Sequence, residues 1–84
     1  MLRAGETVLG ELEYEVLEFL WRVGEADAKE VHAALGKNRG ITLNTVQSAM
    51  KRLFEKDLLA RRKVSHAHRY RARVTKEALG KTVL

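Results

Sequence analysis

Cysteine is absent from the 84-residue sequence, and so is any long apolar run. Without cysteine the chain has no disulfide, no thiolate zinc site and no cysteine nucleophile. No apolar run approaches the roughly 20 residues that a membrane span needs, and the N-terminus lacks the apolar core of a signal peptide. We therefore expect a cytoplasmic protein with no membrane partner.

Signatures of catalysis are missing as well. The sequence contains no glycine-rich phosphate loop and no nucleophile–base motif. Asp27 and Asp57 are interpreted as a helix cap and a turn residue, and the acids of the first predicted helix are expected on its solvated side. With 84 residues and 45% hydrophobic content, the chain is predicted to be one small globular domain that is not an enzyme and binds no cofactor.

Charge is distributed unevenly along the chain. Residues 1–36 carry three basic and eight acidic side chains, a net charge of −5, whereas residues 37–84 carry thirteen basic and three acidic ones, a net charge of +10. This separation indicates that the first part supports the fold and that the second part meets a polyanion. A basic surface that is merely solvated is the plainer alternative, but so large an excess in one part favours nucleic acid.

Helical periodicity predicts three helices before the chain changes to strand periodicity. The first covers about residues 10–23 and the second about residues 28–36. Asp27 and Glu30 have the spacing of a capping box at the start of the second helix. A polar, glycine-containing loop follows, and Thr42 is the expected cap of the third helix.

The third helix is predicted to separate apolar from polar side chains. Its apolar positions follow the i, i+3, i+4, i+7, i+8 template: Val46, Ala49, Met50, Leu53 and Phe54. The opposite face carries side chains that hydrogen-bond base edges: Asn44, Gln47, Ser48 and Lys51. Because amide and hydroxyl residues are mediocre helix formers, their presence together indicates a face that makes contacts.

Period-two alternation then predicts a two-stranded ribbon. Its strands cover residues 59–64 and 68–74, with a turn over 65–67. The ribbon carries six basic side chains: Arg61, Arg62, Lys63, Arg69, Arg71 and Arg73. Since an isolated hairpin is barely stable, its apolar side is expected to pack on the helices. Thr75 is the expected cap of a last short helix.

Three helices followed by a basic hairpin give the order of a winged helix-turn-helix, mainly α with a small β-hairpin. We assign residues 1–8 to a flexible arm, 9–74 to this domain and 75–84 to a short helical tail. In this geometry the third helix enters the major groove of double-stranded DNA, and cations of the wing gain affinity by counterion release. Base readout is expected from Asn44, Gln47, Ser48 and Lys51. Contacts with the DNA backbone are expected from Thr42, Thr45, Arg52, Arg61, His66 and Arg69.

Four short segments carry a family resemblance through their order and spacing: LEYEVL at 12–17, AKEV at 28–31, TVQS at 45–48 and HAHRY at 66–70. Over about residues 8–77 the sequence resembles the N-terminal domain of the penicillinase-repressor (BlaI/MecI) family, with TVQS similar to its recognition helix. The resemblance implies a winged-helix transcriptional repressor that occupies a palindromic operator as a homodimer and excludes polymerase.

Two features differ from the pattern of that family. Typical members continue into a helical dimerisation domain that also contains a protease cleavage site, whereas this sequence stops at Leu84. The copper-responsive branch of the family uses C-terminal cysteines, which are absent here, so copper sensing through thiolates is excluded. Either the sequence is a piece of a longer protein, or a homodimer forms through another surface, for which Leu79, Val83 and Leu84 supply apolar side chains.

The sequence contains three histidines, His32, His66 and His68. His66 and His68 share one region near the turn, but a metal site needs three or four ligands and His32 lies on another helix, so no metal site is predicted. His66 is expected to contact phosphate more strongly when it is protonated.

No small-molecule ligand is evident. Two alternatives stay open, a winged helix that binds another protein and a module that binds nucleic acid without reading its sequence.

Overall fold

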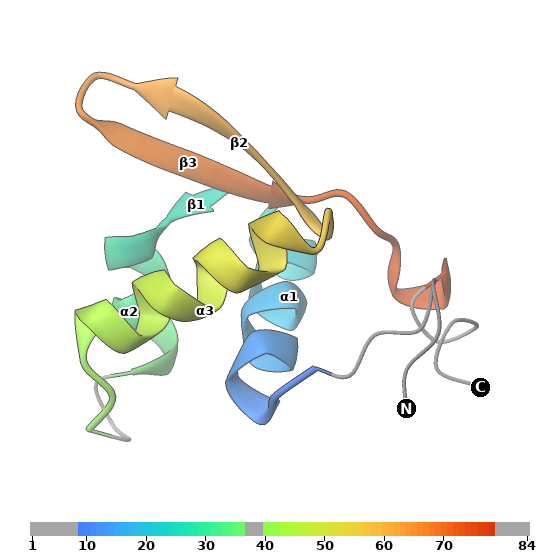
Figure 1. Cartoon of the computed structure of the whole chain (residues 1–84), viewed down its shortest axis with the longest axis horizontal. Coiled ribbons are helices and arrows are strands. Elements are labelled where there is room, and N and C mark those ends of the chain that lie inside the picture. Colours follow the sequence, from blue (N-terminus) through green and yellow to red (C-terminus); the bar gives the residue numbers. More distant parts are fainter. Residues whose placement is uncertain (1–8, 37–39, 79–84) are drawn as a thin grey trace.

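The computed structural model describes residues 9–36 and 40–78. Three helices pack against a three-stranded antiparallel sheet of strand order β1-β3-β2 (Figure 1). The elements follow one another along the chain as α1 (Glu11–Val23), β1 (Ala26–Asp27), α2 (Ala28–Leu35), α3 (Leu43–Glu55), β2 (Leu59–Val64) and β3 (Ala67–Ala72). The predicted arm over 1–8, the loop residues 37–39 and the tail residues 79–84, including Leu79, Val83 and Leu84, lie outside the described residues.

Local hydrogen bonds explain where the helices begin. The Asp27 side chain accepts from the Glu30 N–H at 2.8 Å, and the Glu30 side chain accepts from the Asp27 N–H at 2.9 Å, so the capping box predicted for α2 is confirmed. Thr42 caps α3 by accepting a hydrogen bond from the Thr45 N–H at 3.2 Å. At the C-terminal end of α1, Gly24 has φ +93° and donates its N–H to the Leu20 carbonyl, a conformation that glycine adopts without steric cost.

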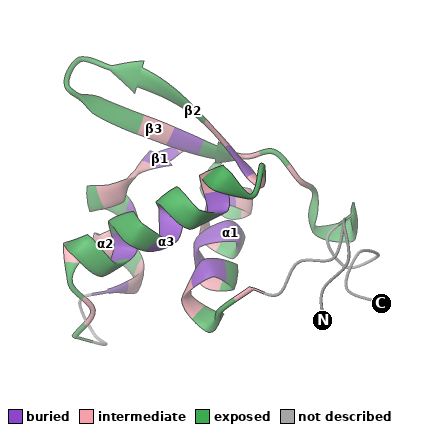
Figure 2. Cartoon of the chain, in the orientation of Figure 1, coloured by how far each residue is buried: buried purple, intermediate pink, exposed green. Residues whose placement is uncertain are grey.

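The core forms where the helices meet the sheet (Figure 2). Four of the five residues in the apolar stripe predicted for α3 are fully buried, and Phe54 is half-buried at its end. α1 and the sheet supply most of the remaining core side chains: Val16, Leu17, Leu20, Leu59 and Tyr70. Because the apolar stripe of α3 is buried in the core, the opposite face of the helix is exposed to solvent.

The sheet differs from the predicted two-stranded ribbon. A third strand, β1, pairs with β3 through Ala26↔Tyr70 and Asp27↔Arg69. Two residues are too short a run to show period-two alternation, which is why the sequence pattern did not reveal this strand. The pairing makes β3 the central strand at Arg69 and Tyr70, so the ribbon is attached to the chain segment that precedes α2.

The turn and the end of the ribbon also differ from prediction. Ala67 pairs with Val64, so the reversal is made by Ser65 and His66 alone. Ser65 adopts φ +58°, which suits the first position of a two-residue hairpin turn. β3 ends at Ala72 and not at Val74, because Ala72 pairs with Leu59, the first residue of β2. The Val74 carbonyl instead accepts a hydrogen bond from the Trp21 indole at 2.7 Å.

A short helical stretch follows the sheet. The Ala78 N–H donates to the Thr75 hydroxyl at 3.0 Å, which confirms Thr75 as a cap, and residues 76–78 are helical. The predicted end of this helix lies beyond the described residues. In the described part of the chain, no helix combines the length and the apolar character needed to cross a membrane.

Candidate nucleic-acid interface

The polar face predicted on α3 is exposed to solvent (Figure 2). Its four members lie opposite the buried stripe: Asn44, Gln47, Ser48 and Lys51. These four side chains have no hydrogen-bonding or ionic partner among the described residues, 9–36 and 40–78. Nothing in the described chain therefore competes with an external partner for their polar atoms.

The N-terminus of α3 adds two hydroxyl groups to this face. The Thr42 and Thr45 hydroxyl oxygens lie 3.0 Å apart, and both residues are exposed. Thr45 is thus not packed in the core. The first N–H groups of a helix attract anions, so a phosphate would meet both the helix terminus and these hydroxyls.

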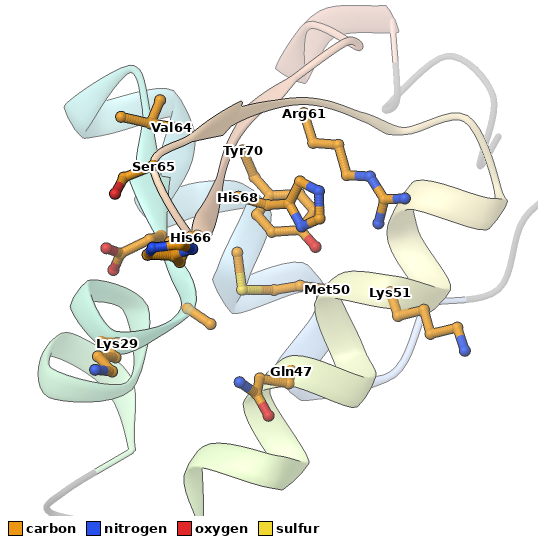
Figure 3. A pocket seen from close by; sticks show the side chains of 13 residues that line it. Lys29, Gln47, Met50, Lys51, Arg61, Val64, Ser65, His66, His68 and Tyr70 are labelled. Atoms are coloured by element: carbon orange, nitrogen blue, oxygen red, sulfur yellow. The ribbon is translucent and has the colours of Figure 1, made fainter.

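An open groove of about 670 Å³ runs between α3 and the hairpin. Figure 3 shows Lys51 on the α3 side of this groove and Arg61 and His68 on the hairpin side. Lys29, from the first turn of α2, lines it as well. Among the described residues that line the groove, Asp27 is the only acid. Basic side chains therefore outnumber acidic ones along the groove, which suits a polyanion.

Lys29 is a lining residue to which the sequence analysis assigned no role. It follows the Asp27 cap, so the start of α2 could be located from sequence, but its position beside the hairpin could not. That position depends on the pairing of β1 with β3. A long-range contact between two-residue segments leaves no periodic signal in the sequence.

Arg61 is positioned on the groove side of the hairpin by an aromatic ring. Its guanidinium carbon lies 4.1 Å from the centroid of the Phe54 ring in α3, within cation–π range. Since residues alternate between the faces of a strand, Lys63 lies on the same side as Arg61 and the buried Leu59. Within the two described segments no carboxylate pairs with Arg61 or Lys63, so both charges are available to an anion.

The other face of the sheet is electrostatically different. Arg62 donates two hydrogen bonds to the Glu25 carboxylate, at 2.8 and 2.9 Å, and Arg69 donates another at 3.1 Å. Arg69 also lies 3.0 Å from a carboxylate oxygen of Glu30. The hydrogen bonds from Arg62 and Arg69 lower the pKa of Glu25 to about 2, so its carboxylate is ionised at neutral pH. The predicted contact of Arg69 with the DNA backbone would require it to exchange these partners for a phosphate.

A second carboxylate pairs with α3 from inside the domain. The expectation that the acids of α1 lie on its solvated side is wrong for Glu13, which is buried. Its oxygens accept hydrogen bonds from Arg52 Nε at 2.7 Å and Lys56 Nζ at 3.1 Å. Burial raises the pKa of Glu13, but the hydrogen bonds from Arg52, the Gly10 N–H and Lys56 together outweigh burial and lower it. Three hydrogen-bond donors thus compensate the buried charge of the Glu13 carboxylate, which the sequence pattern had predicted to be exposed.

The histidines are divided between two places. His32 Nε2 lies 2.7 Å from the Ile41 carbonyl oxygen, whereas His66 and His68 line the groove. Over the residues that the structure describes, no three His, Cys, Asp or Glu side chains are grouped closely enough to bind a metal ion. His66, predicted to contact phosphate, lies at the turn of the hairpin where the groove opens (Figure 3).

The chain is similar to known proteins in both sequence and structure. A family model described as penicillinase repressor matches residues 9–84. The transcriptional regulator BlaI of Mycobacterium tuberculosis, from strains CDC 1551 / Oshkosh and H37Rv, is 37% identical over 65 residues, which cover 76% of this chain and 47% of the relative. The chain therefore spans about half the length of the curated relatives it matches. The solution structure of the DNA-binding domain of the repressor BlaI matches with a TM-score of 0.74 at 22% identity and covers 93% of both chains.

The fold is a winged helix-turn-helix, mainly helical with a small hairpin, as predicted from the sequence. The chain belongs to the penicillinase repressor family. The resemblance carried by the four short segments is therefore confirmed. By its description this is a family of repressors and not of enzymes.

Proposed function

We propose that this chain is the DNA-binding part of a transcriptional repressor, with α3 in the major groove of double-stranded DNA and the hairpin on the DNA backbone. The observation that carries the proposal is the exposed polar face of α3, which borders a groove lined mainly by cationic and hydrogen-bonding side chains. Membership of the penicillinase repressor family supports the same function. Repression follows when the bound protein occupies an operator and excludes polymerase.

Each part of the surface suits a different part of the duplex. Base readout is assigned to the exposed face of α3: Asn44, Gln47, Ser48 and Lys51. The amide groups of Asn44 and Gln47 match the two hydrogen-bonding atoms of an adenine edge, and Lys51 matches guanine or a phosphate. Backbone contacts are assigned to Thr42, Thr45, Arg52, Arg61, His66 and Arg69. Ion pairs argue against two of the six, because Arg69 is held by Glu25 and Glu30 and Arg52 is held by Glu13. The geometry therefore favours the other four.

The proposal extends to a cytoplasmic homodimer on a palindromic operator. Two recognition helices related by a two-fold axis read half-sites one helical turn apart or multiples of it. Measurement of the mass of the complex in solution tests this part. Two protein copies on one symmetric duplex support it, whereas a single copy on a single half-site contradicts it.

Selection of bound sequences from a pool of random duplex DNA tests the central proposal. We expect one sequence motif to be enriched. Gln47→Ala should cost about 1–3 kcal/mol at one base position and relax the preference there. Glu18→Ala, an exposed substitution on α1, is the matched control and should leave the motif unchanged.

Two rival functions predict other results in the same assays. A module that binds nucleic acid without reading sequence gives no motif, and Gln47→Ala weakens its binding to all sequences alike. A protein–protein adaptor shows little dependence of DNA binding on salt and no loss with Lys51→Ala. A sequence-reading repressor loses affinity steeply with salt, with a slope of about −0.9 per phosphate contact.

A further inference from the structure

The two faces of the hairpin carry basic side chains in different electrostatic states. On the groove side, Arg61 stacks on the Phe54 ring and has no carboxylate partner among the described residues. On the outer side, Arg62 and Arg69 are cross-strand neighbours, and both donate hydrogen bonds to one carboxylate of Glu25. Of the outer guanidiniums, those of Arg62 and Arg69 are therefore largely neutralised. Arg71 on the outer side and Arg61 on the groove side have no carboxylate partner among the described residues.

The outer cluster spans all three strands. Asp27 of β1 is the register partner of Arg69 in β3, and Arg69 is the register partner of Arg62 in β2. Arg69 Nη1 lies 3.9 Å from Asp27 and 3.0 Å from Glu30, in addition to its bond with Glu25. Three acidic side chains thus face two arginines on this side of the sheet. Arg62 binds Glu25 through two parallel hydrogen bonds, which is the strong form of an arginine–carboxylate pair.

We propose that Glu25 is a specificity-determining residue for DNA binding, because it keeps Arg62 and Arg69 from adding sequence-independent affinity. This inference rests on the proposed function. DNA seated on α3 in the groove faces Arg61, and the outer guanidiniums lie on the opposite side of the sheet. Arbitrary DNA can instead approach any cationic surface, since binding that ignores sequence depends only on phosphate neutralisation. Neutralised outer arginines therefore lower sequence-blind affinity and leave operator affinity unchanged.

The sign of the effect separates this role from a purely structural one. A carboxylate that merely braced the hairpin would, when removed, loosen the wing and weaken binding to every sequence. A carboxylate that limits sequence-blind binding would, when removed, strengthen binding to arbitrary DNA. Glu25→Gln keeps the size of the side chain and removes its charge, so the two roles predict opposite changes.

The test compares Glu25→Gln with Glu18→Gln, an exposed acid of α1 with no described partner. Fluorescence anisotropy measures binding of each variant to the selected operator and to a duplex of scrambled sequence between 50 and 200 mM salt. For scrambled DNA, Glu25→Gln should steepen the salt slope by about 1–2 and raise affinity roughly tenfold at the lowest salt. Affinity for the operator should stay the same, so the ratio of specific to sequence-blind binding falls roughly tenfold. Glu18→Gln should leave this ratio unchanged.

A triple variant, Glu25→Gln with Arg62→Gln and Arg69→Gln, checks that released guanidiniums cause the change. It should return the salt slope on scrambled DNA to the wild-type value, and thermal melts confirm that each variant is folded. Equal behaviour of Glu25→Gln and Glu18→Gln, or weaker binding of Glu25→Gln to both duplexes, overturns the inference but leaves the proposed function intact. Failure of the wild-type protein to bind any duplex overturns both.

Discussion

Glu13 and Glu25 perform the same chemical task in two different environments. Both belong to the acidic first part of the chain, and each accepts hydrogen bonds from two basic side chains of the second part. The Glu13 side chain is 6% exposed and pairs with α3, whereas the Glu25 side chain is 26% exposed and pairs with the hairpin. The uneven charge along the sequence thus partly reflects pairing within the fold, and burial decides whether a pair supports the core or adjusts the surface charge.

Glu13→Gln is expected to have the largest effect on stability. It removes the charge from a buried group that accepts three hydrogen bonds. Bonds to a charged acceptor are worth about 1.5–3 kcal/mol each, but Arg52 is half-exposed and regains water, so the free energy of unfolding should fall by about 1–3 kcal/mol. Urea denaturation measures this, with Glu18→Gln as the control expected within about 0.5 kcal/mol of wild type. Equal stability of the two variants would show that Glu13 does not fasten α1 to α3.

Glu25→Gln should destabilise the protein less than Glu13→Gln does. Its partners are accessible to water, and exposed ion pairs gain little because solvent and salt screen them. The destabilisation should shrink when urea denaturation is repeated in 1 M salt. A loss that equals that of Glu13→Gln and does not depend on salt would remove the distinction between the two carboxylates.

The pH dependence of stability should separate Glu25 from its glutamine variant. The pKa of Glu25 is lowered from 4.5 to about 2 by Arg62 and Arg69. A lowered pKa means that its contribution to stability is present in full above pH 4.5 and is lost as the pH falls towards 2. The difference in unfolding free energy between wild type and Glu25→Gln should therefore diminish over this range. A difference that is constant from pH 6 to pH 2 would contradict the ion-pair assignment.

Lys51→Ala should have the smallest effect on stability, because Lys51 is exposed and pairs with no carboxylate in the described chain. Urea denaturation should give a value within about 0.5 kcal/mol of wild type. On DNA, in contrast, the salt slope should become shallower by about one. Lys51 has no carboxylate partner in the described chain. It thus serves as the reference for the four basic side chains that Glu13 and Glu25 bind. Strong destabilisation without a change in slope would show that Lys51 belongs to the fold.

Local signals in the sequence were sufficient for the helices and for the face of α3. The apolar stripe from Val46 to Phe54 fixes which side turns inward, and Asp27 and Thr42 mark where helices begin. The pairs made by Glu13 join residues 39 and 43 positions apart. Such contacts depend on how α1 packs on α3, which neither periodicity nor capping specifies.

The uneven charge along the chain has two causes, a polyanion partner and pairing within the fold. It indicated a polyanion partner for the basic part, but a −5 segment beside a +10 segment is also what internal pairing requires. Arg69 illustrates the difference: its alternation placed it correctly on the outer face of β3, yet the acids opposite it belong to β1 and α2. Because the sequence pattern does not predict β1, it does not bring these acids and Arg69 together.

A titration of the isotopically labelled protein with duplex DNA at low ionic strength, followed by NMR, tests the central claim most directly. Amide resonances of residues 42–52 in α3 and 61–68 in the hairpin should shift, while those around Tyr14 and Glu18 on the exposed side of α1 should not. Unchanged resonances over residues 42–52, with shifts elsewhere or none at all, would contradict the assignment of α3 as the element that reads DNA.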